Sequence, residues 1–131
     1  MSKQPLRAFT LWWILGMGLV VFVFYQSLTP VPIELSDYQF SDKLGHFMAY
    51  FILMSWFAQL YKRGAHLILL LLFFAMGIGI EVLQGQTDYR LFELADVAAN
   101  SLGALSAWVL AAGGYATLLL RAESASSSSS N

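Results

Sequence analysis

Three short groups of polar residues in this chain have the types and the spacing that acid–base chemistry or ligand binding requires. In the first group, Asp42, His46 and Tyr50 follow one another at intervals of four residues, which places them on one face of a helix. A carboxylate bonded to an imidazole fixes the tautomer of the ring and raises its basicity. The spacing therefore predicts a bond between Asp42 and His46 and makes His46 a candidate acid or base, whereas a structural hydrogen bond is the plainer interpretation.

The second and third groups add carboxylates and amides. Glu81 and Gln84 are three residues apart, and Asp96 and Asn100 are four residues apart, so each pair shares a helix face. Glu81 lies within an apolar stretch, where a charged side chain facing lipid costs about 3 kcal/mol. We therefore expect the Glu81 side chain to point inward, toward a partner on another helix.

Arg90 and Lys43 supply positive charge beside these groups. The guanidinium of Arg90 is a rigid planar fork that suits a carboxylate or a phosphate. The alternative is a salt bridge from Arg90 to Asp88, Glu93 or Asp96. Lys43 precedes the apolar stretch of its segment and is expected to face solvent or an anionic headgroup.

Together these residues predict one site. The catalytic candidates are His46, Glu81 and Asp96, and the substrate-binding candidates are Asp42, Lys43, Tyr50, Gln84, Arg90 and Asn100. Carboxylates with one histidine are possible ligands of a divalent metal, but the chain has no H-x-x-x-H or H-E-x-x-H spacing. No metal ligands and no cofactor are therefore predicted.

The elements that must position these residues are membrane helices. The stretches 8–33, 44–61, 64–80 and 97–120 contain no Asp, Glu, Lys or Arg, and a membrane-spanning helix needs about 20 mostly apolar residues. Hydrophobic residues make up 58% of the chain and charged residues 11%, whereas an ordinary soluble domain carries about 25% charged residues. We predict an all-α fold, an integral membrane bundle of four transmembrane helices.

The predicted domain covers 9–120, after a cytoplasmic N-terminus over 1–8. Its helices are expected over about 9–28, 42–61, 65–84 and 92–112, with Ser41 as the N-cap of the second and the acids Glu34 and Asp37 in the connection before it. The first helix follows basic residues, as a signal peptide does, but no small-residue cleavage site comes after it, so we expect an uncleaved anchor. The serine-rich tail over 121–131 is predicted to be disordered.

Small residues predict how the last helix packs. Ala99, Gly103, Ala107 and Ala111 recur at intervals of four residues, which forms a ridge that another helix backbone can approach closely. Gly77 and Gly79 in the third helix are the expected place for this ridge to pack.

Alternating helix directions bring the three polar groups to the same end of the bundle. With the N-terminus inside, the inner loops carry five basic residues, and the outer loops carry two. The excess of Lys and Arg marks the cytoplasmic side, so both termini are predicted in the cytoplasm and the site at the extracytoplasmic face. The inner basic residues are Lys3, Arg7, Lys62, Arg63 and Arg121, and the outer ones are Lys43 and Arg90.

The composition excludes several classes of function. The formal net charge is −1 and no dense run of Lys or Arg exists, so no nucleic-acid partner is expected. The chain has no cysteine, which excludes disulfides, thiolate catalysis and cysteine-ligated metals. Three classes remain open. They are a protein that binds a headgroup, peptide or drug, an acid–base enzyme acting on a phosphorylated or lipid-linked substrate, and a structural protein whose polar layer holds helices together.

The same residues resemble the signature of the VanZ-like family. The segment from Asp42 to Phe51 is similar to its D-K-x-x-H-x-x-x-Y pattern, and the residues from Glu81 to Gly103 are similar to E-x-x-Q…R…D-x-x-x-N-x-x-G. The resemblance covers about residues 40 to 105. It implies a multi-pass protein of the bacterial inner membrane and cell envelope. The founder of the family is associated with resistance to the glycopeptide antibiotic teicoplanin, so the resemblance implies membrane lipids, a lipid-linked envelope precursor or a glycopeptide as partner.

Overall fold

The computed structural model describes residues 1–30 and 38–128, and these residues form helices joined by short turns. The long helices are α1 (Phe9–Leu28), α2 (Tyr38–Leu60), α3 (His66–Gln84) and α4 (Leu94–Ala111), and α5 (Leu118–Ser128) follows them. The short helices η1 (Arg63–Ala65) and η2 (Tyr115–Thr117) precede α3 and α5. Within the described residues the only β-type pairing is an isolated bridge between Lys3 and Tyr61. The predicted all-α fold class is confirmed.

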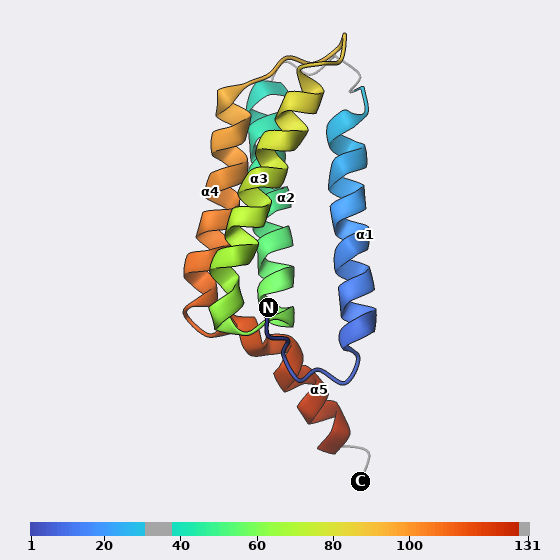
Figure 1. The fold of residues 1–131 in the computed structure, drawn as a ribbon, viewed down its shortest axis with the longest axis vertical. Coiled ribbons are helices and arrows are strands. Elements are labelled where there is room, and N and C mark those ends of the chain that lie inside the picture. The colour runs from blue at the N-terminus through green and yellow to red at the C-terminus, as the bar shows by residue number, and fades with distance from the viewer. Residues whose placement is uncertain (31–37, 129–131) are drawn as a thin grey trace.

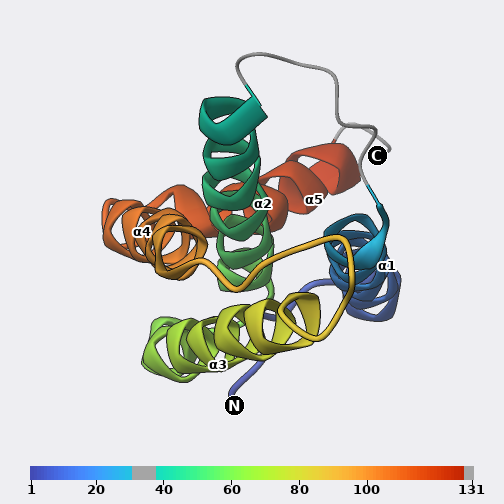
Figure 2. The ribbon, with the colours of Figure 1, turned by 90° about the horizontal axis from the view of Figure 1, so that it is seen from above.

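The four long helices run side by side, and α2 packs against each of the other three (Figure 1). Seen from above, α4, α3 and α1 lie along one side of α2, and the other side of α2 is open (Figure 2). The fully buried side chains of α2, among them Tyr50, Leu53 and Met54, face these neighbours. α2 is therefore the central helix of the bundle, and it is also the helix that carries the first polar group.

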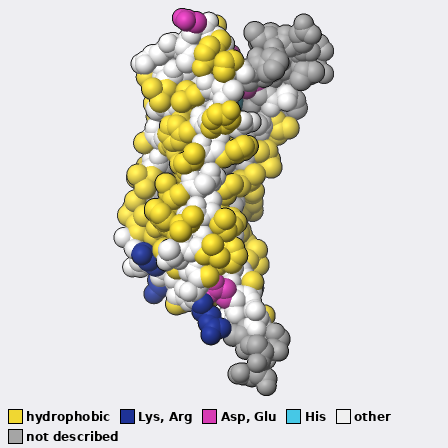
Figure 3. Space-filling view, turned by 90° about the vertical axis from the view of Figure 1, so that its right-hand side faces the viewer, with side chains coloured by type: hydrophobic (Ala, Val, Ile, Leu, Met, Phe, Trp, Pro, Cys, Tyr) yellow, Lys and Arg dark blue, Asp and Glu magenta, His cyan; other side chains and the backbone are white. Residues whose placement is uncertain are grey.

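Among the residues that the structure describes, three helices are long and apolar enough to cross a membrane. They are α1, the segment Arg63–Gln84 that contains η1 and α3, and α4. Large hydrophobic side chains cover the outside of the molecule between its two ends (Figure 3). α2 has 23 residues, but its polar residues Asp42, Lys43 and His46 make it less apolar than the other three. Three of the four predicted spans therefore meet the requirement by length and composition.

Close helix contacts depend on glycine at two positions. A Cβ at Gly103 would lie 2.1 Å from the carbonyl oxygen of Phe47, so the backbones of α4 and α2 touch there. A Cβ at Gly16 would lie 2.9 Å from Trp56 and Phe57, where α1 meets α2. At Gly103 the small-residue ridge of α4 thus packs on α2 and not on α3 as predicted. Of the two expected glycines of α3, Gly77 faces α4 at Asn100, and Gly79 has no neighbour within 4 Å.

The C-terminal tail differs from its prediction. A disordered tail was expected over 121–131, but α5 continues to Ser128 and packs below the bundle (Figure 1). Glu123 explains this docking, because its carboxylate accepts hydrogen bonds from the backbone N–H groups of Arg7 and Ala8 and from the indole N–H of Trp12. These donors lie at the N-terminal end of α1, where unpaired N–H groups and the helix dipole favour an anion.

Two expectations concern the start of α2. Ser41 was predicted as its N-cap, but the helix already begins at Tyr38, so Ser41 lies inside the first turns. The predicted connection with Glu34 and Asp37, and the last tail residues 129–131, lie outside the described residues.

Candidate functional site

The three polar groups meet at the end of the bundle where α1 and α3 finish and α2 and α4 begin. The connection from α3 to α4 crosses this end, runs toward α1 and returns to α4 (Figure 2). The N-terminus and α5 lie at the opposite end (Figure 1). The predicted convergence of the polar groups in one layer is therefore what the fold produces.

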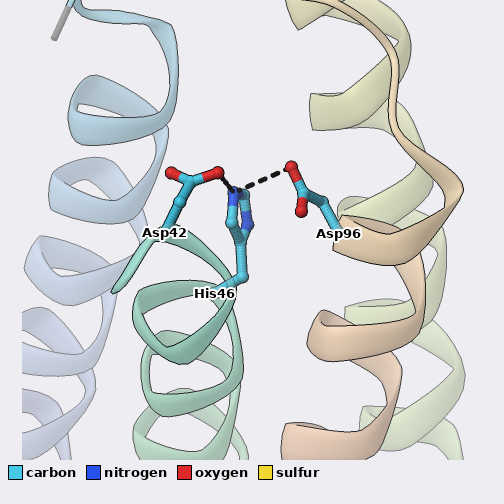
Figure 4. A group of neighbouring side chains, drawn as sticks. All are labelled: Asp42, His46 and Asp96. Carbon is cyan, nitrogen blue, oxygen red and sulfur yellow. Dashed lines mark ion pairs between the residues drawn. The ribbon is translucent and has the colours of Figure 1, made fainter. Parts of the chain in front are cut away.

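His46 lies at the centre of this layer and is 92% buried. Its Nδ1 lies 3.0 Å from Oδ1 of Asn100, and because that oxygen can only accept, Nδ1 carries the proton. Its Nε2 lies 3.8 Å from Oδ2 of Asp42 and 3.5 Å from Oδ2 of Asp96, from two different helices (Figure 4). The hydrogen-bond partner of the ring is therefore Asn100, whereas Asp42 and Asp96 lie at ion-pair distance from Nε2, beyond ordinary hydrogen-bond length. The predicted contact between Asp42 and His46 is thus present as an ion pair.

Each of these two carboxylates is held by its other oxygen. Oδ1 of Asp42 accepts a hydrogen bond of 2.8 Å from the guanidinium of Arg90. Oδ1 of Asp96 accepts one of 3.1 Å from Lys43, which also pairs with Glu93 at 2.8 Å. The two basic residues thereby fix the carboxylates so that the Oδ2 atoms face His46.

Arg90 and Gln84 also form hydrogen bonds with the C-terminal end of α1. The backbone carbonyl of Ser27 accepts hydrogen bonds from Nε2 of Gln84 at 2.7 Å and from Arg90 at 3.1 Å, and that of Leu28 accepts one from the Tyr89 hydroxyl. The last carbonyls of a helix have no partner within the helix. Side chains from α3 and from the connection after it satisfy these two.

Glu81 is fully buried, as predicted, and its partner is a backbone group. Its Oε1 accepts a hydrogen bond of 2.8 Å from the N–H of Glu93, the residue before α4. Glu81 therefore holds the start of α4 against α3. A Cβ at the neighbouring Gly77 would lie 3.3 Å from the Asn100 side chain, so the small size of this residue lets Asn100 enter the layer.

A cavity of about 350 Å³ opens beside His46, between α1 and α2. Its polar wall contains Asp42, His46 and Arg90, and its apolar wall contains Phe22, Val23 and Ala49. Gln26, Ser27, Ser41, Gly45 and Tyr50 complete the lining. The cavity is therefore amphipathic, with its charged groups near the ends of the helices.

Four buried polar atoms in this layer have no hydrogen-bond partner among the described residues. They are the Tyr50 hydroxyl, Oε2 of Glu81, Oε1 of Gln84 and Nδ2 of Asn100. Buried polar atoms in proteins nearly always have a partner, so such a group marks a functional or solvent-filled place. Tyr50 is the one of these residues that also lines the cavity.

The structure divides the predicted site residues into two sets. Asp42, His46, Tyr50 and Arg90 line the cavity, and Asp96, Asn100 and Lys43 lie directly behind them. Glu81 and Gln84 belong to the same layer, but their hydrogen bonds hold the start of α4 and the end of α1. Arg90 pairs with Asp42, which was not among the acids expected as its partner.

The contribution of α1 to the site was missed by the sequence interpretation, which treated this helix as an anchor. Gln26 and Ser27 are polar residues at the end of an otherwise apolar segment, and both line the cavity. Their position on the same membrane side as the three polar groups was the signal in the sequence.

Comparison with known proteins supports the resemblance seen in the sequence. No match was found among curated proteins or among solved structures. The model of the VanZ/LLP1 family matches residues 4–119, which include all four long helices and the whole polar layer. This all-α membrane protein therefore belongs to the VanZ/LLP1 family.

Proposed function

We propose that this protein binds an amphipathic envelope ligand, a membrane lipid or a lipid-linked precursor, in the cavity between α1 and α2. The observation that carries the proposal is the separation of apolar and charged walls in one cavity. An acyl or prenyl chain fits against Phe22, Val23 and Ala49, and a polar headgroup fits against Asp42, His46 and Arg90.

The size and the position of the cavity support this ligand class. A volume of about 350 Å³ is at the lower end of the range for small-molecule sites, roughly 300–1,000 Å³. Phe22 lines the cavity and is 57% exposed, so a chain bound at the apolar wall continues into the surrounding lipid. The cavity then holds the headgroup and the part of the chain next to it.

The proposed location is the bacterial inner membrane, with α2 as the fourth span and both termini in the cytoplasm. Lys3, Lys62 and Arg63 lie at the end that carries the termini, opposite the polar layer (Figures 1 and 3). The positive-inside rule favours this end as the cytoplasmic one. The cavity then opens at the extracytoplasmic leaflet, where envelope precursors and glycopeptides are found.

The test is native mass spectrometry of the protein extracted with its surrounding lipid. The Ala49→Trp variant fills the cavity and should lose at least about 90% of a specifically retained ligand, a change of about 1.4 kcal/mol or more in binding free energy. Leu102→Trp adds the same side chain on the outer face of α4, where Leu102 is 56% exposed, and should retain the ligand. Equal retention by the two variants contradicts the proposal.

Direct binding of teicoplanin by the purified protein would assign the cavity to a glycopeptide instead of a lipid. Teicoplanin titrated into the same two variants distinguishes these ligands, because only a cavity ligand should respond to Ala49→Trp. We expect no saturable teicoplanin binding to either variant.

An acid–base enzyme is the second candidate function. It is favoured by the tautomer of His46, because a protonated Nδ1 leaves Nε2 free to accept a proton from a ligand hydroxyl at the cavity wall. For such an enzyme, the retained ligand should be converted by the wild-type protein and accumulate unchanged in His46→Gln. A binding protein should leave the ligand unchanged in both.

A further inference from the structure

We propose that Asp42, His46 and Asp96 bind one divalent transition-metal cation, Zn²⁺ or Mn²⁺, at the polar wall of the cavity. One atom from each of the three residues lies within 4.8 Å of the other two. The side chains come from α2 and α4 and point toward a common centre (Figure 4). Two carboxylates and one imidazole form a ligand set that suits these cations.

The distances favour a shared cation over direct bonds between the three side chains. Nε2 of His46 lies 3.5 Å from Oδ2 of Asp96 and 3.8 Å from Oδ2 of Asp42. A charge-assisted hydrogen bond would draw nitrogen and oxygen to about 2.8 Å. Two ligand atoms about 2.1 Å from a tetrahedral metal are about 3.4 Å apart, so the observed separations need only a small contraction around the ion.

Each proposed ligand is oriented by a second hydrogen bond through its other polar atom. Nδ1 of His46 bonds to Asn100, Oδ1 of Asp42 to Arg90, and Oδ1 of Asp96 to Lys43. Metal-binding histidines usually donate their other N–H to an oxygen acceptor, and bonded carboxylates are held in the same way. Nε2 and both Oδ2 atoms are thereby left facing one another, so that either a proton on Nε2 or a metal cation between the three atoms balances the two carboxylates.

Two further observations point to a bound group at this place. Tyr50 lies one turn from His46 on the same helix, is 99% buried, lines the cavity, and has no partner for its hydroxyl among the described residues. A water or a ligand oxygen in the cavity would give that hydroxyl a partner. In addition, the layer contains more carboxylates than bases, which favours a cation. The acids at the cation centre and beside it are Asp42, Glu93 and Asp96, and the permanently charged bases are Lys43 and Arg90.

The experiment is calorimetric titration of Zn²⁺ and of Mn²⁺ into the metal-stripped full chain in nanodiscs. The wild type should bind one equivalent of at least one of the two cations. His46→Gln and Asp96→Asn should each weaken binding at least 100-fold, and Asn100→Ala, which removes only the orienting bond, about 10-fold. Asp88→Asn removes an exposed carboxylate from the neighbouring loop and should bind like the wild type.

The absence of saturable binding by the wild type, or equal affinity in His46→Gln, Asp96→Asn and Asp88→Asn, would overturn the proposal. If His46→Gln and Asp96→Asn do not fold, the wild type alone decides. Pulsed electron paramagnetic resonance of the Mn²⁺-loaded protein, or X-ray absorption of the Zn²⁺-loaded one, should then show a single imidazole nitrogen bound to the metal. A spectrum with only oxygen ligands would contradict the site.

The proposal of a metal site is independent of the proposal that the cavity binds a lipid. Ala49→Trp should remove at least about 90% of the retained lipid and leave one equivalent of metal bound, because Ala49 is not a metal ligand. A protein that binds metal but no lipid would therefore refute the proposed function alone. A metal on Nε2 would also occupy the lone pair that the acid–base candidate needs.

Discussion

At the scale of single residues, the structure changes the role of Arg90 most. The sequence offered it as a phosphate-binding side chain or as a partner of a neighbouring acid. In the structure its guanidinium joins Asp42 of α2 to the last turn of α1, through bonds of 2.8 Å to Asp42 and 3.1 Å to the Ser27 carbonyl. Arg90 therefore forms part of the cavity wall and orients the carboxylate of Asp42, which faces His46.

Replacing Arg90 should consequently lower stability as well as ligand binding. Arg90→Gln removes a charged donor from two acceptors that are largely buried, and a hydrogen bond to a charged group contributes about 2 kcal/mol. We expect the free energy of unfolding in detergent to fall by about 2 kcal/mol, measured by chemical denaturation. Arg63→Gln, at an exposed position at the other end of the molecule, is the control. Equal effects of the two substitutions would show that the Arg90 contacts contribute little.

At the scale of elements, the contact between α2 and α4 decides where His46, Asp96 and Asn100 meet. Gly103 lies about one turn beyond Asn100, and its missing side chain lets α4 touch the backbone of α2. The sequence predicted the small-residue ridge correctly but assigned it to α3. A ridge identifies the face of a helix that packs closely, whereas the choice of partner depends on the arrangement of all four helices.

Gly103→Ala should separate α2 from α4. The added Cβ would meet the Phe47 carbonyl at 2.1 Å, and overpacking of a filled interior costs about 1–3 kcal/mol. Gly79→Ala makes the same change on α3, where nothing lies within 4 Å, and should change stability by less than about 1 kcal/mol. Thermal unfolding of both variants in the same detergent checks this. Similar melting temperatures would contradict the close approach of the two helices.

The docking of α5 should depend on pH. The hydrogen bond from Trp12, with the bonds from the Arg7 and Ala8 amides, holds the pKa of Glu123 below its ordinary value of 4.5. The stabilisation from these bonds is therefore complete above pH 4.5 and is lost as the pH falls through the lowered pKa. Amide hydrogen exchange in α5 should then rise at low pH.

Glu123→Gln is the control for this effect. The amide keeps the shape of the side chain but carries no charge, so exchange in α5 should be faster at neutral pH and nearly independent of acidification. Exchange that responds to pH equally in the wild type and in Glu123→Gln would assign the effect to other carboxyl groups.

At the scale of the whole molecule, apolar stretches and their polar ends were enough to predict most of the architecture. The long helices begin and end within a few residues of the predicted limits, and the three polar groups converge as expected. The sequence placed Gln26 and Ser27 on the membrane side of the polar groups, but it could not show that they line the cavity, because this depends on how helices distant along the chain pack. The folded tail was also missed, since its serine-rich composition hides the contact of Glu123 with the start of α1.

The orientation in the membrane gives a prediction for the entire chain. Because the chain has no cysteine, single cysteines can report the side on which each end lies. Asp88→Cys should react with a membrane-impermeant maleimide in intact cells. Gly64→Cys, where an added side chain meets no neighbour within 4 Å, should react only after the membrane is opened. The reverse pattern would place the site in the cytoplasm.

Photo-crosslinking from the cavity in native membranes tests most directly whether the polar layer binds a ligand. A photoreactive amino acid at position 49 should capture one defined lipid or lipid-linked species, and this capture should be lost when His46→Gln is added. The same amino acid at position 102, on the outer face of α4, should capture bulk phospholipid whether or not His46 is changed. If positions 49 and 102 capture the same bulk lipids and neither responds to His46→Gln, the polar layer is not a ligand-binding site.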